Sequence, residues 1–221
     1  DANNYRIRKI DLTTNIITTI AGTGVIANSG IAASANGYGG PALSCNVLSG
    51  TAGLDVDSTG NLYVSNSTAS VVSKINIQGD NKVNIIAGTW GVPGYAGDGG
   101  LATNAALANP YGVAIDSAGN IYIADTNNKV IRKVTASTGI ITIVAGNYSG
   151  LQGSGDHATN AVLFYPRSIA VDSDGNIFSV SKGVPRIVSS ENYTNNFGIQ
   201  WNMFDKTQLD RAADGQNISS Q

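Results

Sequence analysis

Hydrophobic and polar residues alternate along most of the chain, in short runs that end at glycine-containing turns. The segment DSAGNIYIAD, residues 116–125, is representative, because a tight turn opens onto an alternating strand. Alternation with a period of two is typical of β-strands, in which successive side chains point to opposite faces. The pattern predicts an all-β fold, with strands over residues 53–57, 62–66, 112–116, 121–125, 129–134, 140–145, 168–172 and 176–180.

The same turn occurs three times. DSTGN at Asp57 and DSDGN at Asp172 repeat the DSAGN at Asp116, at spacings of 59 (116 − 57) and 56 (172 − 116) residues. A fixed period of this length indicates a repeat architecture. Each copy predicts a hairpin, because Asp, Gly and Asn suit a tight bend, and a third strand and an apolar fourth strand follow. Four antiparallel strands per repeat describe a propeller blade.

The repeat also predicts how the chain is organised. Residues 1–22 match 125–146 at a constant offset of 124, so the sequence opens with the third and fourth strands of a blade. Residues 191–221 are expected to form an irregular last strand and a polar C-terminal segment. Within residues 1–190 we expect full blades over 53–88, 112–146 and 168–190 onward, joined by long glycine-rich loops.

Three phrases make the chain resemble the NHL-repeat β-propellers. They are NPYGVAIDSAGNIYIADTNNKVIRKV, GYAGDGGLATNAALANP and the runs IIAGT and IVAGN, and the likeness extends over about residues 1–190. The resemblance implies a toroid of four-stranded blades that binds protein, RNA or carbohydrate, although some relatives are enzymes. About three and a half blades are present, whereas closed propellers have four to eight. We therefore expect flanking sequence or other chains to complete the ring.

The charge and the apolar content of the chain argue against two classes of partner, nucleic acids and membranes. Charged residues make up 13 % of the chain and the net charge is −2, so no strong field attracts nucleic acid. Basic residues recur on the third strand of separate blades, where we expect them to face water. No run of about 18 apolar residues exists, so we expect no membrane insertion. The basic residues of these strands are Arg6, Arg8 and Lys9, and Lys129, Arg132 and Lys133.

No catalytic or metal-binding constellation is visible in the sequence. The resemblance implies that enzymatic relatives use several histidines around a metal, but His157 is the single histidine and we expect it to be a solvated loop residue. The turn at Asp172 lacks the glycine spacing and the distant Glu of a calcium loop. Cys45 is the only cysteine, which excludes an internal disulfide, and we interpret it as a partly buried filler. We expect no cofactor.

Four Asn-X-Ser/Thr sequons occur, a number close to chance for this composition. Asn66 and Asn147 fall at predicted strand ends, where we expect an exposed backbone and a usable glycan acceptor in a secreted eukaryotic protein. The chain begins at Asp1 without a methionine, and both a processed chain and a fragment fit secretion. The full set of candidates is Asn66, Asn147, Asn192 and Asn217.

The half blade at the start predicts an assembly edge. Its two strands have no first and second strand before them, so an open backbone edge and an apolar face need a cover. A strand from another copy would be a head-to-tail contact, which closes into a ring or propagates as a fibre. A longer chain that completes the same blade is the alternative. The edge residues are Tyr5, Ile7, Ile10, Ile17 and Ile20, and the candidate donor strand holds Phe197, Ile199, Trp201 and Met203.

These observations favour a non-enzymatic extracellular β-propeller scaffold or interaction module, as a subunit of a larger homomeric or fibrous glycoprotein assembly. The expected partners are other copies of the chain or other proteins, with carbohydrate as a further candidate. One alternative is a lyase or hydrolase of the NHL-propeller type whose catalytic residues lie outside this chain. An extracellular sensor domain is a second alternative.

Overall fold

The computed structural model describes residues 1–46, 50–147, 158–181 and 184–188 of the 221-residue chain. The chain divides into two units, Asp1–Ser190 and Glu191–Gln221, and all described residues lie in the first. The helical elements of these described residues are short 3-10 turns, and none is long and apolar enough to cross a membrane. They are η1 (Ala2–Asn4), η2 (Ala33–Asn36), η3 (Ala42–Ser44), η4 (Ala102–Asn104), η5 (Thr126–Asn128) and η6 (Ala158–Asn160).

Thirteen strands in the described residues form four antiparallel sheets, which confirms the all-β prediction. Each predicted strand is present, with ends shifted by no more than two residues. The sheets are β1 (Ile7–Asp11) and β2 (Ile16–Ala21); β3 (Thr51–Val56), β4 (Leu62–Asn66), β5 (Val71–Ile75) and β6 (Val83–Ala87); β7 (Pro110–Ile115), β8 (Ile121–Asp125), β9 (Val130–Val134) and β10 (Ile141–Ala145); β11 (Pro166–Val171), β12 (Ile177–Ser181) and β13 (Val184–Val188).

The repeated turn has the same hydrogen bonds in all three copies. In the last copy, Asp172 Oδ1 accepts from the backbone N–H groups of Asp174 at 3.0 Å and Asn176 at 2.8 Å. The amide of Asn176 also donates to Asp172 Oδ2, and these bonds lower the pKa of Asp172. Asp116 and Asp57 make the equivalent backbone bonds. The carboxylate of each turn is therefore engaged in shaping the hairpin.

The second strands of the two four-stranded blades, β4 and β8, are buried on both faces, which explains their nearly continuous apolar sequences. In β4, Tyr63 packs with Ile123 of the following blade, whereas Val64 packs with Ile7 of the preceding half blade. In β8, Tyr122 is adjacent to Ile123 but points to the other face, where it packs with Ile177 of the following blade. Successive residues of one strand thus enter two different cores, one on each side of the blade.

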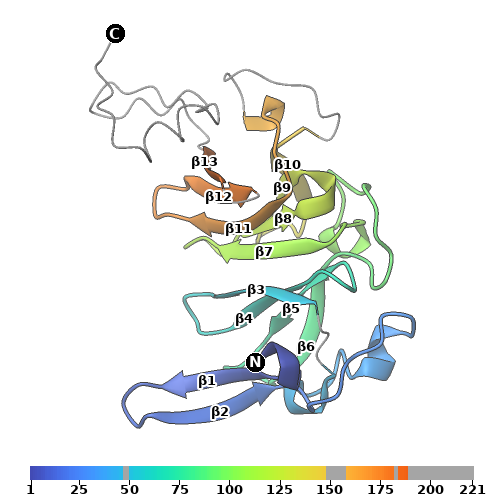
Figure 1. The fold of residues 1–221 in the computed structure, drawn as a ribbon, viewed down its shortest axis with the longest axis vertical. Helices are drawn as coiled ribbons and strands as arrows, with labels where there is room; N and C mark the ends of the chain where they lie inside the picture. Colours follow the sequence, from blue (N-terminus) through green and yellow to red (C-terminus); the bar gives the residue numbers. More distant parts are fainter. Residues whose placement is uncertain (47–49, 148–157, 182–183, 189–221) are drawn as a thin grey trace, which may run out of the picture. The chain divides into compact units, whose positions relative to one another are not determined.

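The first strands of successive blades, β3, β7 and β11, lie side by side (Figure 1). A Cβ atom on Gly112 would lie 2.6 Å from the Arg167 carbonyl oxygen, so glycine is required for this approach. The neighbouring pair, β3 and β7, is linked by a bond from the Ile115 N–H to Asp55 Oδ2 at 2.7 Å. This packing brings the starts of β7 and β11, and hence Tyr111 and Arg167, next to each other.

Candidate functional site

A buried polar cluster lies at the end of β8, in η5 and in β9. Asp125 is fully buried, and its carboxylate accepts from the Ala108 N–H at 2.7 Å and the Asn128 amide at 2.8 Å. The Arg132 guanidinium lies 3.8 Å from the same carboxylate. Burial raises the pKa of Asp125 to about 6, against the opposing effect of these donors and of the Arg132 charge.

Arg132 holds the loop before its blade in place. Its guanidinium donates to the carbonyl oxygens of Ala96 at 3.3 Å and Ala106 at 3.1 Å, and it pairs with Asp98 at 3.4 Å. The sequence pattern predicts that the basic residues of the third strands face water. For Arg132 this prediction is wrong, because its side chain is buried. The cluster of Asp125, Asn128 and Arg132 was missed because the sequence pattern does not reveal where a loop folds back.

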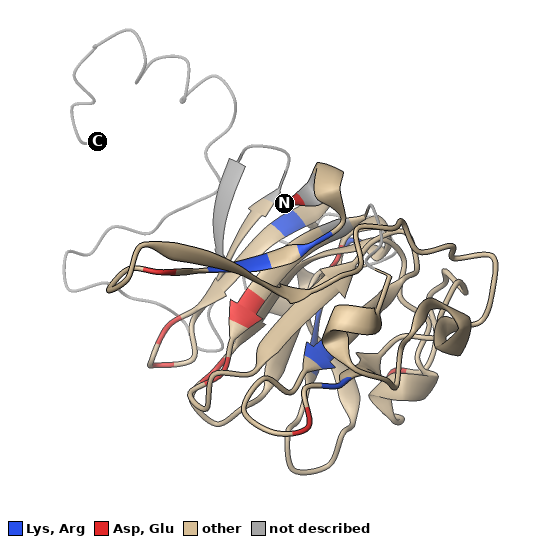
Figure 2. Cartoon of the chain, turned by 90° about the horizontal axis from the view of Figure 1, so that it is seen from below, with Lys and Arg blue, Asp and Glu red and all other residues tan. Residues whose placement is uncertain are grey.

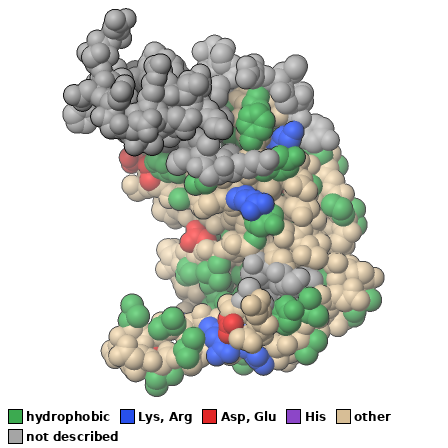
Figure 3. Space-filling view, viewed as in Figure 1, with side chains coloured by type: hydrophobic (Ala, Val, Ile, Leu, Met, Phe, Trp, Pro, Cys, Tyr) green, Lys and Arg blue, Asp and Glu red, His purple; other side chains and the backbone are tan. Residues whose placement is uncertain are grey.

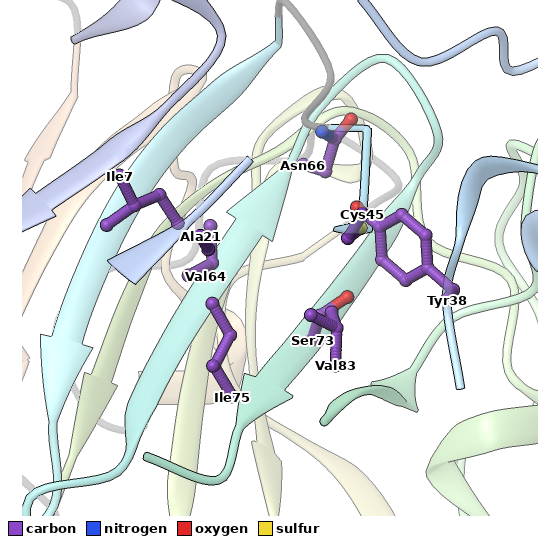
Figure 4. Close-up of a pocket in the computed structure, with 9 residues that line it drawn as sticks. All are labelled: Ile7, Ala21, Tyr38, Cys45, Val64, Asn66, Ser73, Ile75 and Val83. Carbon is purple, nitrogen blue, oxygen red and sulfur yellow. The ribbon is translucent and has the colours of Figure 1, made fainter. Parts of the chain in front are cut away.

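The blade β3–β6 lacks this cluster. In the repeat frame Ser73 replaces Arg132 and Asn66 replaces Asp125, and the preceding loop carries Tyr38 in place of Asp98. A small cavity of about 20 Å³ lies here, lined by Ile7, Ala21, Tyr38, Cys45, Val64, Asn66, Ser73, Ile75 and Val83 (Figure 4). The Ser73 hydroxyl is buried and has no hydrogen-bond partner among the described residues. A cavity of this size suits one or two water molecules rather than an organic ligand.

Cys45 lines the same cavity. Its side chain is buried, as the sequence predicts, and burial raises the pKa of the thiol to about 12. Burial also raises the pKa of the Tyr38 hydroxyl. A thiol with a raised pKa carries little thiolate at neutral pH, so Cys45 does not have the environment of a nucleophile.

One blade face lacks the cover that its equivalents have. Leu54 in β3 is 48 % exposed, whereas Val113 in β7 is 4 % exposed and Ile169 in β11 is 9 % exposed at the same repeat position. Val113 and Ile169 pack against the second strand of the preceding blade, through Tyr63 and Tyr122 respectively. Among the described residues, the half blade before β3 consists of β1 and β2 and has no such strand.

A second uncovered face belongs to β12. Phe178 is 40 % exposed, while Tyr63 and Tyr122, at the same position of the two preceding blades, are 6 % and 5 % exposed. Val180 is exposed as well, although Ala124 at its position in β8 is fully buried. We call the β3 face at Leu54 and the β12 face at Phe178 and Val180 the two uncovered blade faces.

The predicted assembly edge is partly corrected by the structure. In the described residues β1 pairs with β2 alone, so its other edge has no strand, as expected. Ile10 and Ile17 are exposed, and Figure 3 shows hydrophobic side chains on the surface of this hairpin. However, Ile7 is buried and Ile20 packs against the same core, so these two side chains are covered by the β3–β6 blade of the same chain and need no cover from another copy. Tyr5 is half-buried.

A row of cations and tyrosines lies at the starts of β7 and β11. The Arg167 guanidinium lies over the Tyr111 ring, with Cζ 5.0 Å from the ring centroid. Lys129, which follows η5, places its Nζ 5.8 Å from the centroid of Tyr165. Tyr165 and Arg167 are both exposed, and the residue between them, Pro166, is buried. We call Lys129, Tyr165, Arg167 and Tyr111 the cation–tyrosine row.

The two blades that supply this row are joined directly beneath it. The Thr126 hydroxyl, in η5, donates to the Pro166 carbonyl at 2.5 Å. Positive φ angles occur at Lys129 (57°) and Tyr165 (51°), so both residues sit at sharp bends of the backbone. Charged residues of both signs are spread over the other described strands and turns, as Figure 2 shows.

The remaining candidates have mixed outcomes. Asn66 is 3 % exposed and its side-chain oxygen accepts from the Ala69 N–H at 2.9 Å, so the expectation of an exposed acceptor is wrong for this sequon. Asn147 is half-buried at the end of a described segment. No group of three or more metal-ligating side chains occurs in the described part of the chain. His157, Asn192, Asn217 and the donor-strand residues Phe197, Ile199, Trp201 and Met203 lie outside the described residues.

Comparison with known proteins identifies the repeats. Residues 57–152 match the family model of the teneurin NHL domain. The match covers β4 to β10, that is, the second blade in full and the first blade without β3, and it confirms the resemblance to NHL-repeat propellers.

Solved structures of propeller type are similar to this chain. An auxiliary nutrient binding protein from Bacteroides thetaiotaomicron aligns with a TM-score of 0.59 and 16 % identity, covering 86 % of this chain and 44 % of that one. Its counterpart from Bacteroides ovatus has a TM-score of 0.56, 18 % identity and coverages of 83 % and 44 %. A Bacteroides thetaiotaomicron protein of unknown function aligns with a TM-score of 0.56 and 22 % identity, covering 81 % of this chain and 40 % of that one. At these identities the likeness establishes the fold, and the chain spans less than half of each relative.

Proposed function

We propose that the chain is part of a non-enzymatic extracellular NHL propeller that serves as an interaction module, with both uncovered blade faces covered by further blades. The observation that carries the proposal is the exposure of Leu54 and Phe178 at positions that are buried in the other blades. Apolar surface of this kind costs roughly 25 cal/mol per Å² when it faces water. A blade is the cover that the repeat itself uses at these positions.

The extracellular and non-enzymatic parts of the proposal have separate support. The teneurin NHL match over residues 57–152 favours an extracellular setting. The acidic side chains with shifted pKa values have structural tasks. Asp125 binds Arg132, and the others accept backbone N–H groups in turns: Asp11, Asp57, Asp80, Asp116 and Asp172. A turnover activity of this chain that is lost in His157→Ala would contradict the non-enzymatic assignment.

The cover can come from a second copy or from more of the same polypeptide, and one experiment separates the two sources. Leu54→Asp and Phe178→Asp place a charge on each uncovered face. Leu43→Asp is the matched control, because Leu43 is similarly exposed but lies in a loop turn, η3. The masses of the chain and its three variants are measured by light scattering, and the binding of an apolar dye is measured in parallel.

If a second copy covers the faces, the wild-type mass is a multiple of 22.7 kDa and both face variants shift it to the monomer. If further blades of the same polypeptide cover them, the 221-residue chain is monomeric and binds the dye, and both face variants lower the dye fluorescence. The proposal fails if the two face variants behave like Leu43→Asp in both measurements.

A further inference from the structure

The cation–tyrosine row holds two positive charges that no described carboxylate balances. Arg167 is exposed and Lys129 half-exposed, and neither takes part in an ion pair within the described part of the chain. Asp125 is close in sequence to Lys129, but it is fully buried and bound to Arg132. The row therefore presents two cations to solvent.

A similar unit elsewhere in the chain shows what this one lacks. Lys74 lies over the Tyr63 ring, with Nζ 5.2 Å from the centroid. The same ammonium is 3.5 Å from Asp57 Oδ2, and the Tyr63 hydroxyl donates to that oxygen at 3.2 Å. In the β3–β6 blade a cation, a tyrosine and a carboxylate thus form one set.

The row contains the cation and the tyrosine of such a set twice, but without the carboxylate. The two pairs are Arg167 with Tyr111 and Lys129 with Tyr165. The contact with the ring orders each cation before a ligand arrives, which reduces the entropy lost on binding. A guanidinium over a ring face keeps the N–H groups at its edge available, and these bind a carboxylate through two parallel bonds.

We propose that the cation–tyrosine row binds carboxylates of an acidic segment of a protein partner. Two cations are too few to follow a phosphate backbone, and the net charge of the chain is −2, so a nucleic acid fits poorly. A sugar ring would stack on an open aromatic face, whereas each tyrosine here has a cation over one face. The carboxylates of an acidic peptide need only the N–H donors of the two cations, which the ring contacts leave available.

The inference extends the proposed interaction function but does not depend on how the blades are covered. The row is formed by β7, β11 and the segments beside them, all within the described residues. Its test measures ligand binding, while the test of the proposed function measures mass and dye binding, so the two can fail separately.

The probe is a fluorescent ten-residue peptide of alternating Glu and Ala, and its binding is followed by anisotropy at low salt. Variants Arg167→Gln and Lys129→Gln each remove one charge of the row. Lys9→Gln is the control, because Lys9 is an exposed lysine of β1 that lies outside the row. Circular dichroism verifies that every variant keeps its β-structure.

We expect Arg167→Gln to weaken binding of the Glu peptide by about tenfold, the effect of losing one charged hydrogen-bond pair. Lys129→Gln should weaken it severalfold, and Lys9→Gln by less than about twofold. Arg167→Lys should restore part of the affinity, because the charge returns without the fork geometry.

Three outcomes would overturn the proposal. Equal binding of a Gln–Ala peptide would show that carboxylates are not recognised. Equal effects of Arg167→Gln and Lys9→Gln would show general electrostatic attraction instead of a site. Binding of an RNA oligonucleotide or an oligouronate that depends on Arg167, without binding of the Glu peptide, would assign the row to a different class of ligand.

Discussion

The Arg132 guanidinium lies 3.8 Å from the Asp125 carboxylate, and both side chains are buried in the β7–β10 blade. The neighbouring blade has replaced both members, with Ser73 and Asn66 at the same positions. Two blades of one chain therefore show two solutions for the same interior, one ionic and one neutral. The comparison between them leads to predictions about stability.

Removing one member of the buried pair should cost more than removing both. Arg132→Ser leaves Asp125 buried without its cation, and we expect a loss of about 3–5 kcal/mol in the free energy of unfolding. Adding Asp125→Asn, which reproduces the chemistry of the β3–β6 blade, should recover at least about 1 kcal/mol. Chemical denaturation of the single and double variants measures this coupling. Additive effects would show that the two side chains act independently.

The raised pKa of Asp125 predicts a pH dependence. Between its ordinary value of 3.8 and the raised value of about 6, the folded state binds the proton more tightly than the unfolded state. The contribution of Asp125 to stability is therefore full at low pH and declines as the pH rises through this window. In Asp125→Asn the decline should be absent when unfolding is measured from pH 4 to 6.

Asp172 provides a control of opposite sign. Its pKa is lowered, so its contribution is present above pH 4 and is lost as the pH falls further. Asp172→Asn should flatten the acid side of the stability profile and leave the window between pH 4 and 6 unchanged. A variant of Asp125 that alters only the acid side would contradict the assignment.

Gly112 should be essential for the contact between β7 and β11. A Cβ atom there would lie 2.6 Å from the Arg167 carbonyl oxygen, and we expect Gly112→Ala to cost about 1–3 kcal/mol. Ser168 occupies the same repeat position in β11 and is exposed, so Ser168→Ala is the matched control and should be nearly neutral. Thermal unfolding of the two variants tests the difference, and equal effects would refute the close-approach argument.

The Cys45 thiol should be unreactive in the folded protein. It is buried, and its pKa is raised to about 12, so both access and thiolate formation are disfavoured. A maleimide reagent at pH 7 should label the chain in denaturant and not in buffer. Rapid labelling of the folded chain would mean that the cavity lined by Cys45 opens frequently.

Asn66 should carry no glycan in a secreted eukaryotic preparation. Its amide lies in the interior and its oxygen accepts a backbone N–H, so an attached sugar would prevent this packing. Asn147 remains the better acceptor of the two. Peptide mapping by mass spectrometry distinguishes the sites, and a glycan on Asn66 in correctly folded protein would contradict the buried position.

The strands and the repeat follow from the sequence, because they depend on local physics. Short apolar runs bounded by turns identify β4 and β8, and the Asp-X-X-Gly-Asn turns identify the hairpins, since each turn satisfies its own backbone donors. The same periodicity places the half blade at the start of the chain. None of these features requires knowledge of a distant contact.

The environments of single side chains were decided by tertiary structure. The repeat pattern alone indicates that Arg132 is a surface residue of an outer strand. In the structure, a loop more than 25 residues earlier in the sequence folds over this side chain, and the loop carbonyl groups of Ala96 and Ala106 accept hydrogen bonds from the guanidinium. Asn66 looks like an exposed strand end until Ala69 turns back to bind it. The cation–tyrosine row exists because β7 and β11 lie side by side, and this packing joins residues 56 positions apart, Tyr111 and Arg167. Such contacts depend on loop paths and blade packing, which a local hydrophobic pattern does not encode.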